Sequence, residues 1–512
     1  MKNESAVFWY SLSICAVFVF WGALAPSHLQ AVSSNVTTYI SEAFGWYYLL
    51  IIMLFLSFCI YLIFSRFGKI KLGKESDRPE FSLLSWFAML FSAGMGMGLV
   101  FWTTAEPISH AFISPPTAEA GSDEAIKQSL QYSFFHWGIH AWAVYGIVAL
   151  ALAYFKFRKG LPGLISATLI PLFGEKHMQG LPGKLIDTLA IFATVVGVAS
   201  TLGFGSAQIN GGLSFLFHTP NTYGMQLLIL AIATALFIYS AWSGIGKGIK
   251  YLSNINMGLG LVLMIMLFIV GPTLYILNMY TATIGSYITN FFDMSFRISP
   301  LNETGRTWID NWTIFYWAWW ISWAPFVGIF IARISRGRTI KEFMLGVLFV
   351  PAFVCFIFFT VFGVSALNLE QNGLAIISDY SLETTTFGVL QHYPLGELMS
   401  LLTIVVIAIF FITSADSATF VLGMLSTNGS INPANSVKIV WGLAMSAMAA
   451  IIVYFGGTQG LQNMLIIAAL PFSVVMLLMG VSFYKAANQD GAVKANKKSW
   501  KKEKNESINK IG

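Results

Sequence analysis

Long apolar stretches alternate with short polar connections from one end of the chain to the other. Each apolar stretch holds about 20 residues, enough for one helix to cross a hydrocarbon layer roughly 30 Å thick. Because backbone polar groups within lipid must be satisfied inside the segment, we expect these stretches to be helices. Twelve spans are predicted, near residues 7–27, 46–65, 84–104, 132–155, 186–216, 224–243, 252–278, 311–333, 342–366, 396–424, 437–455 and 464–484.

The composition agrees with a membrane protein. Apolar residues make up 56% of the 512 residues and charged residues only 10%, well below the roughly 25% of soluble domains. Ala23 and Ala25 could mark a cleaved signal after the first apolar run, but eleven further spans would still hold the chain in the membrane. Cys15, Cys59 and Cys355 lie within apolar spans, so we expect core residues rather than disulfides.

Lysine and arginine gather on one side of the predicted topology. Alternating the spans places 26 of the 29 on the side of both termini, and the exceptions are Lys127, Arg297 and Arg306. The positive-inside rule then predicts cytoplasmic termini. The net charge of +6 includes a tail with eight lysines from Lys485 to Lys510. This tail suits anionic lipid headgroups rather than nucleic acid, or it serves only as a topology signal.

Residues 93–98 read Ala-Gly-Met-Gly-Met-Gly in the middle of the third span. Each glycine costs a helix about 1 kcal/mol relative to alanine. A spacing of two also scatters the glycines around the helix. We therefore predict an unwound segment whose backbone, around Met95, Gly96 and Gly98, lines a cavity for a substrate or cation. Close helix packing through small residues is the alternative.

Aromatic residues gather in the fourth and eighth spans. In the fourth, Trp137, Trp142 and Tyr145 fall within an arc of about 140° on one helix. In the eighth, Pro325 and Gly328 predict an interruption after a run of tryptophans: Trp312, Trp317, Trp319, Trp320 and Trp323. Aromatic faces attract a methylated ammonium by about 2 kcal/mol in a dry site. These residues predict a cage for such a cation, or alternatively an aromatic belt at the headgroup level.

Few polar side chains could carry chemistry within the spans. His136 and His140 have the spacing of two metal ligands on a helix, but no carboxylate accompanies them in that span, so we favour hydrogen-bonded histidines. The carboxylates Glu106, Asp187 and Asp416 lie near predicted span ends. Because no hydrolase constellation can be assembled from these groups, we expect no enzyme.

The tenth span offers two adjacent hydroxyls, Thr413 and Ser414, at membrane depth. Hydroxyl and carbonyl oxygens bind small hard cations. These two residues are therefore candidate cation ligands, unless their hydroxyls only bond back to their own helix.

The stretch from Trp312 to Pro351 resembles the signature of the betaine/choline/carnitine transporter family. The similarity extends to residues 93–98 with Ala105-Glu106-Pro107, to His136–Tyr145 and to Thr413–Ser417, and is strongest for glycine betaine carriers. It implies an all-α protein of the bacterial cell membrane, a homotrimer with a LeuT-like inverted repeat of five helices, spans 3–7 and 8–12. The chain would divide into peripheral helices (1–83), first repeat (84–280), linker (281–310), second repeat (311–484) and basic tail (485–512).

The resemblance also assigns ligands. The substrate cage comprises Trp137, Trp142, Tyr145, Trp319, Trp320 and Trp323, with backbone at Met95, Gly96 and Gly98, and Trp320 is expected to matter most. The first sodium site comprises Ser92, Met95, Phe410, Thr413 and Ser414, and the second Ala93, Thr194 and Phe326. At Val198 the family's second site has another threonine. Because a methyl group cannot replace a hydroxyl ligand, the sodium stoichiometry stays open.

Gly98 bears on the choice of substrate. Choline carriers of the family tend to have an aspartate there, whereas a neutral residue suits a zwitterion. No lysine or arginine lies between Lys184 and Lys247 or within 342–424 to replace a cation. We therefore expect a symporter that imports glycine betaine or a similar compatible solute with Na⁺ for osmoprotection, without a cofactor. Alternatives are a sodium-independent carnitine or betaine exchanger, a proton-coupled choline carrier, and an osmosensing channel or receptor.

Overall fold

The computed structural model describes residues 5–94, 96–243, 246–374 and 379–490, and over these residues the regular elements are all helices, with one isolated bridge between Lys71 and Thr339. The elements of the first part are α1 (Ala6–Leu24), α2 (Pro26–Phe64), η1 (Arg66–Lys69), α3 (Leu83–Gly94), α4 (Met97–Ile108), η2 (Ser109–Ile113), α5 (Asp123–Trp137), α6 (Ile139–Ala153), η3 (Tyr154–Arg158), η4 (Ser166–Leu169), α7 (Ile170–Phe173), α8 (Glu175–Gln179), α9 (Leu181–Phe217) and α10 (Tyr223–Ser243).

The remaining elements follow in the second part of the chain. They are α11 (Gly246–Val270), α12 (Thr273–Thr289), α13 (Phe291–Phe296), α14 (Glu303–Ile309), η5 (Asp310–Ile314), α15 (Phe315–Ile334), α16 (Ile340–Gln371), α18 (Thr385–Gln391), α19 (Gly396–Ser426) and α20 (Asn435–Asn488). Of the short elements, η1 and η4 are 3₁₀ turns, and η2, η3 and η5 are π-helical.

Ten helical stretches within the described residues are long and apolar enough to cross a membrane. The chain is thus a multi-pass membrane protein, as predicted. The third predicted span is divided between α3 and α4, which have 12 residues each. The last two predicted spans both lie within α20, and non-helical Gly457, with φ 51° and ψ −138°, divides α20 into two helical parts between them. The count of twelve spans therefore stays a prediction.

The seventh predicted span, 252–278, ends earlier than expected. Helix α11 stops at Val270, and α12 starts at Thr273. Pro272 cannot donate a backbone hydrogen bond, and the Thr273 hydroxyl instead donates to the Phe268 carbonyl at 2.7 Å. The pattern of apolar residues continued across this break, so the predicted boundary was wrong.

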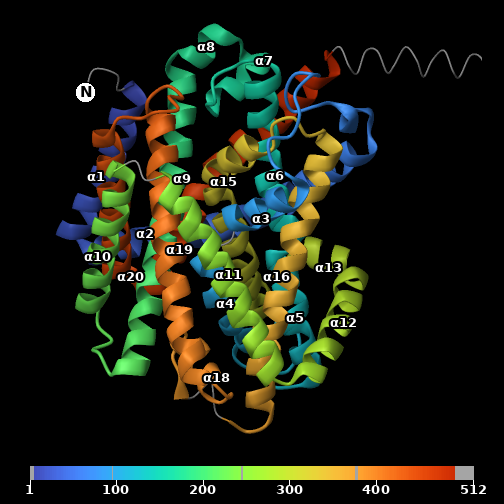
Figure 1. The fold of residues 1–512 in the computed structure, drawn as a ribbon, viewed down its shortest axis with the longest axis vertical. Coiled ribbons are helices and arrows are strands. Elements are labelled where there is room, and N and C mark those ends of the chain that lie inside the picture. The colour runs from blue at the N-terminus through green and yellow to red at the C-terminus, as the bar shows by residue number, and fades with distance from the viewer. Residues whose placement is uncertain (1–4, 95, 244–245, 375–378, 491–512) are drawn as a thin grey trace, which may run out of the picture.

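The helices differ sharply in how deeply they are buried. In the most apolar stretch of Asp123–Arg158, which contains α5 and α6, 94% of residues are buried, and in that of Glu303–Ile334, with α15, 89% are. The corresponding share is only 28% in both α1 and α10. Figure 1 shows α1 and α10 at one edge of the molecule and α12 and α13 at the opposite edge. The predicted aromatic spans are therefore the central helices.

A polar cluster joins distant parts of the chain at the end of the molecule that carries α7 and α8 (Figure 1). Asp490, just after α20, accepts from Arg158 Nη2 at 2.6 Å and from the Tyr154 hydroxyl at 3.0 Å, and Lys159 Nζ lies 3.3 Å away. Arg158 also donates to the carbonyls of Lys71 and Gly73. This buried cluster ties the end of α20 to η3 and to the loop before α3.

Candidate functional site

The third span is broken where the glycines predicted a break. Helix α3 ends at Gly94 and α4 begins at Met97, and Gly96 between them is extended, with φ −140° and ψ −151°. Met95 lies outside the described residues. A Cβ atom on Gly96 would lie 3.7 Å from Ser414 Oγ and 3.9 Å from the Trp323 ring. The break thus faces α15 and α19 together.

The eighth span is not interrupted at Pro325, contrary to the prediction. Helix α15 continues through Pro325 to Ile334. Gly328 has a packing role instead, because a Cβ atom there would lie 2.6 Å from the Val148 side chain of α6. The irregular part of this span lies upstream, in the π-helical segment Asp310–Ile314.

The fourth span has a break that the sequence analysis missed. Gly138, with φ −89° and ψ −150°, separates α5 from α6. A Cβ atom there would lie 2.4 Å from the Phe134 carbonyl oxygen, which explains the glycine. Because a helix leaves its last carbonyls without partners, the His136 carbonyl is available and accepts from Trp320 Nε1 at 2.9 Å. The break therefore provides a hydrogen-bond acceptor that orients Trp320, the residue expected to matter most in the cage.

The aromatic side chains form a buried cluster between α5 and α15. Trp319 and Trp320 stack with centroids 5.5 Å apart and planes 4° apart. Trp137 meets Trp320 edge-on at 4.9 Å and Trp319 at 6.1 Å. All three rings are at most 3% exposed. They are not a headgroup belt, since belt residues would be exposed at the surface.

The other predicted cage residues extend this cluster. Tyr145 meets Trp320 edge-on at 6.1 Å, and Trp142 meets Tyr145 at 5.5 Å. The Tyr145 hydroxyl is buried and has no hydrogen-bond partner among the described residues. Trp323 donates from Nε1 to the Gly197 carbonyl of α9 at 2.9 Å, and its ring would lie 3.9 Å from a Cβ atom on Gly96 at the break in the third span. Trp142 contacts the cluster through Tyr145. The three residues predicted to share one helix face are divided by the break at Gly138, with Trp137 on α5 and the other two on α6.

Gly98 lies directly against the cluster. A Cβ atom at this position would be 2.7 Å from Trp319 Cη2 and 3.6 Å from Trp137 Cη2. Real Cβ atoms do not approach other atoms so closely, so any larger residue would displace Trp319. The absence of a side chain lets the α4 backbone pack directly against the Trp319 ring.

Glu106 of α4 holds two of the aromatic side chains, and the sequence analysis did not assign it to the site. Its Oε2 atom accepts from Trp137 Nε1 at 2.9 Å and from the Tyr316 hydroxyl at 2.6 Å. Tyr316 in turn stacks against Trp320, with centroids 6.0 Å apart. The sequence did contain a signal, because a carboxylate in an apolar span needs partners and marks a functional site.

Two histidines complete the surroundings of Glu106. Oε1 lies 2.7 Å from His136 Nδ1 and 3.3 Å from His110 Nε2. The three side chains could offer ligand atoms to a metal, as these atoms lie within 4.8 Å of one another. However, His136 Nε2 is already 3.0 Å from the Thr313 hydroxyl, so both nitrogens of His136 have partners. His140 instead forms a hydrogen bond with Ser295, so His136 and His140 have separate partners and do not form a pair of metal ligands.

The predicted sodium ligands are brought together only in part. Thr413 of α19 donates back to the Ile409 carbonyl at 2.9 Å, which leaves its oxygen lone pairs available. Ser414 faces Gly96, and Phe410 is buried nearby on the same helix. Met95 lies outside the described residues, as do the side chains of Ser92 and Ala93.

At the second sodium site, Thr194 of α9 also donates back, to the Ala190 carbonyl at 2.8 Å. Phe326 contacts Trp323 with ring centroids 5.5 Å apart, and Trp323 bonds Gly197, one turn from Thr194. Val198 follows Gly197 and is 1% exposed. The two methyl groups of Val198 thus lie where the family's second sodium site has a threonine hydroxyl.

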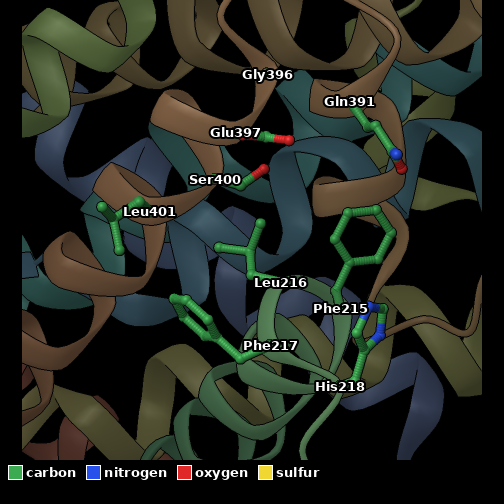
Figure 2. Close-up of a pocket in the computed structure, with 9 residues that line it drawn as sticks. All are labelled: Phe215, Leu216, Phe217, His218, Gln391, Gly396, Glu397, Ser400 and Leu401. Atoms are coloured by element: carbon green, nitrogen blue, oxygen red, sulfur yellow. The ribbon is translucent and has the colours of Figure 1, made fainter.

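A cavity of about 390 Å³ lies apart from these residues, between the end of α9 and the start of α19. Glu397 and Ser400 lie on successive turns of α19 opposite Leu216 and Phe217 of α9 (Figure 2). The complete lining is Phe215, Leu216, Phe217, His218, Gln391, Gly396, Glu397, Ser400 and Leu401. None of these belongs to the predicted cage or sodium sites.

Comparison with known proteins identifies the family. The model of the BCCT, or betaine/carnitine/choline, transporter family matches residues 6–492. The chain is 57% identical over 490 residues to the glycine betaine transporter OpuD of Bacillus subtilis, and 96% of each chain is covered. It is 43% identical to a probable glycine betaine transporter of Desulfitobacterium hafniense, with 96% of this chain and 98% of that protein covered.

A third relative is named for a different substrate. The chain is 44% identical to the ectoine/hydroxyectoine transporter of Virgibacillus pantothenticus, with 94% of this chain and 96% of that protein covered. The resemblance predicted from the tryptophan-rich signature is confirmed. The chain belongs to the betaine/carnitine/choline family, and it is therefore a transporter rather than an enzyme.

Proposed function

We propose that this protein imports glycine betaine together with Na⁺. The observation that carries the proposal is the buried cluster of Trp137, Trp319 and Trp320 beside the broken third span. A trimethylammonium group cannot donate a hydrogen bond, so aromatic faces in a dry site are its best partners. The relatives named as glycine betaine transporters support this substrate.

The carboxylate of betaine would lie near the unwound backbone. Gly98 lets the start of α4 pack against Trp319, and the N-terminal end of a helix favours a negative group. A zwitterion would thus place its cationic head on the rings and its anionic end on α4. A neutral Gly98 fits a substrate that carries its own negative charge, which favours betaine over choline.

Sodium would bind between the third span and α19, at the first predicted site. Support comes from Ser414, which faces Gly96, and from Thr413, whose oxygen can still accept after donating to Ile409. The second site is left out of the proposal because Val198 offers no oxygen. In the full proposal, twelve spans with two inverted repeats alternate access around these sites, and both termini are cytoplasmic.

Uptake into proteoliposomes tests this function. Labelled betaine should accumulate above its external concentration only while an inward Na⁺ gradient exists. Uptake that is undiminished without sodium would remove the coupling and favour an exchanger. Equilibration without accumulation would indicate a channel. Unlabelled ectoine, carnitine and choline, added as competitors, would define the substrate range.

A matched pair of variants tests the sodium ligand. Thr413→Val should raise the Na⁺ concentration for half-maximal uptake by about tenfold, since one oxygen ligand is lost. Thr403→Val is the control, because Thr403 lies on the same helix and also donates back, to Met399 at 2.8 Å. Its sodium dependence should match the wild type. Equal effects of both substitutions would count against the site.

A further inference from the structure

Glu106 is a buried carboxylate adjacent to the proposed substrate cage. It is 0% exposed, and its Oε2 atom accepts from Trp137, a cage residue, and from Tyr316, which stacks on Trp320. An ionisable group at this depth is costly and is normally retained for function. The aromatic rings alone do not explain why a carboxylate is kept here.

The contacts of Glu106 are those of an anion. The indole N–H of Trp137 can only donate, so Oε2 is an acceptor there. The Thr313 hydroxyl can donate to His136 Nε2, and a neutral His136 then donates from Nδ1 to Oε1. Donors on both oxygens stabilise the charged form of a carboxylate.

No strong cation cancels this charge. Among the described residues, no lysine or arginine lies within 4.0 Å of the Glu106 carboxylate, whose ion-pair partners are His110 and His136. Arg297 binds the Tyr132 hydroxyl at 2.9 Å and the Pro116 carbonyl instead. With neutral histidines the cluster keeps one negative charge behind the Trp137 ring.

We propose that the charge of Glu106 acts through Trp137 to select cationic head groups over neutral groups of the same shape. This inference rests on the proposed function. Donation of the indole N–H to a carboxylate increases the electron density of the ring, which strengthens its attraction for a cation. The charge itself also favours a cation in a site of low dielectric constant. Glu106 is thus a positioning and selectivity residue without touching the substrate.

The experiment compares betaine with tert-butylacetate, in which a neutral tert-butyl group replaces the trimethylammonium head. Affinities of purified protein in nanodiscs are measured by displacement of labelled betaine. Glu106→Gln should weaken betaine binding about tenfold and change that of tert-butylacetate less than about twofold. The preference for betaine should fall by the same tenfold.

Asp187→Asn is the matched control. Asp187 is also a buried carboxylate, but it accepts from the backbone N–H and hydroxyl of Ser166, at 2.9 and 2.6 Å, away from the cage. Its neutralisation should leave both affinities within about twofold of the wild type. Unchanged betaine affinity in Glu106→Gln, or equal losses for the two ligands, would overturn the inference.

A conservative variant covers the case in which Glu106→Gln does not fold. Glu106→Asp keeps the negative charge beside Trp137, so it should retain most of the preference for betaine; a preference lost as completely as the charge removal predicts would overturn the inference. Failure of the proposed function has a separate signature, because the wild-type protein would then not bind betaine. Failure of this inference alone requires a wild type that binds betaine and a Glu106→Gln variant with unchanged preference.

Discussion

Glu106 and Asp490 are both buried carboxylates that join helices distant in sequence, yet their partners differ. Each accepts from a tyrosine hydroxyl, Tyr316 at 2.6 Å and Tyr154 at 3.0 Å. Asp490 is otherwise surrounded by cations, with Arg158 Nη2 at 2.6 Å. Glu106 instead accepts from the Tyr316 hydroxyl and the indole of a cage tryptophan, and its ion-pair partners are histidines rather than arginine or lysine. The first centre thus pairs its carboxylate with arginine and lysine, whereas among the described residues neither lies within 4.0 Å of the second.

This difference separates a structural cluster from a functional one. A carboxylate paired with arginine contributes no net field, and its removal mainly leaves a buried cation unpaired. A carboxylate held by neutral donors projects its charge onto neighbouring groups. Substitutions at the Asp490 centre should therefore change stability, and substitutions at the Glu106 centre should change betaine binding.

The largest effect is expected for Asp490→Asn. Arg158, whose side chain is 12% exposed, would lose its buried charged partner and keep only Glu75, a carboxylate that is 68% exposed. The protein should lose about 3 kcal/mol of stability, while its betaine affinity should stay within about twofold. Thermal denaturation in detergent, followed by size-exclusion chromatography, and betaine binding measure the two quantities. An unchanged melting temperature, or a large loss of affinity, would contradict the contrast between the centres.

A smaller effect is expected for Trp320→Leu, which keeps apolar bulk but removes the aromatic face. Loss of about 2 kcal/mol of cation–π attraction should weaken betaine binding about 30-fold. Trp317→Leu is the control, because Trp317 lies on the same helix but stacks on His140, with centroids 5.7 Å apart. It should alter stability only. Equal affinities of the two variants for betaine, measured by equilibrium binding, would disprove the cage.

The smallest effect is expected for Tyr316→Phe, which removes one donor to Glu106 and keeps the ring on Trp320. Betaine affinity should fall about threefold, because the Glu106 carboxylate loses one hydrogen-bond donor and the ring at position 316 can move relative to Trp320. Tyr154→Phe makes the same change at the Asp490 centre and should leave affinity unchanged. Isothermal titration calorimetry with betaine measures the affinity of both variants. A greater loss of affinity in Tyr154→Phe than in Tyr316→Phe would contradict the assigned roles of the two centres.

Features set by local sequence were predictable. The glycines of residues 93–98 predicted the break between α3 and α4, because three glycines within one turn and a half weaken a helix whatever surrounds it. The tryptophans of the eighth span predicted an aromatic cluster. Their burial distinguished the cage from a belt, and burial depends on which helices are central.

Features that depend on contacts between distant residues were not predictable. Glu106 is 30 residues from His136 and 210 from Tyr316, so no spacing along the chain points to that network. Gly138 looked like any other small residue until the Phe134 carbonyl was placed against it. Pro325 suggested a break, but the helix continues through it, packed between other central helices.

The close approach of Gly98 to Trp319 constrains how this protein could evolve toward another cargo. A carboxylate at position 98 would suit a purely cationic substrate, but its first carbon would already overlap the indole, at 2.7 Å from Cη2. A smaller residue would have to replace Trp319 before an acidic residue could be accommodated at position 98. A protein with only the first of these two changes would lack one aromatic face of the proposed cage. Positions 98 and 319 are therefore coupled, and a residue larger than glycine at 98 requires a different side-chain arrangement at 319.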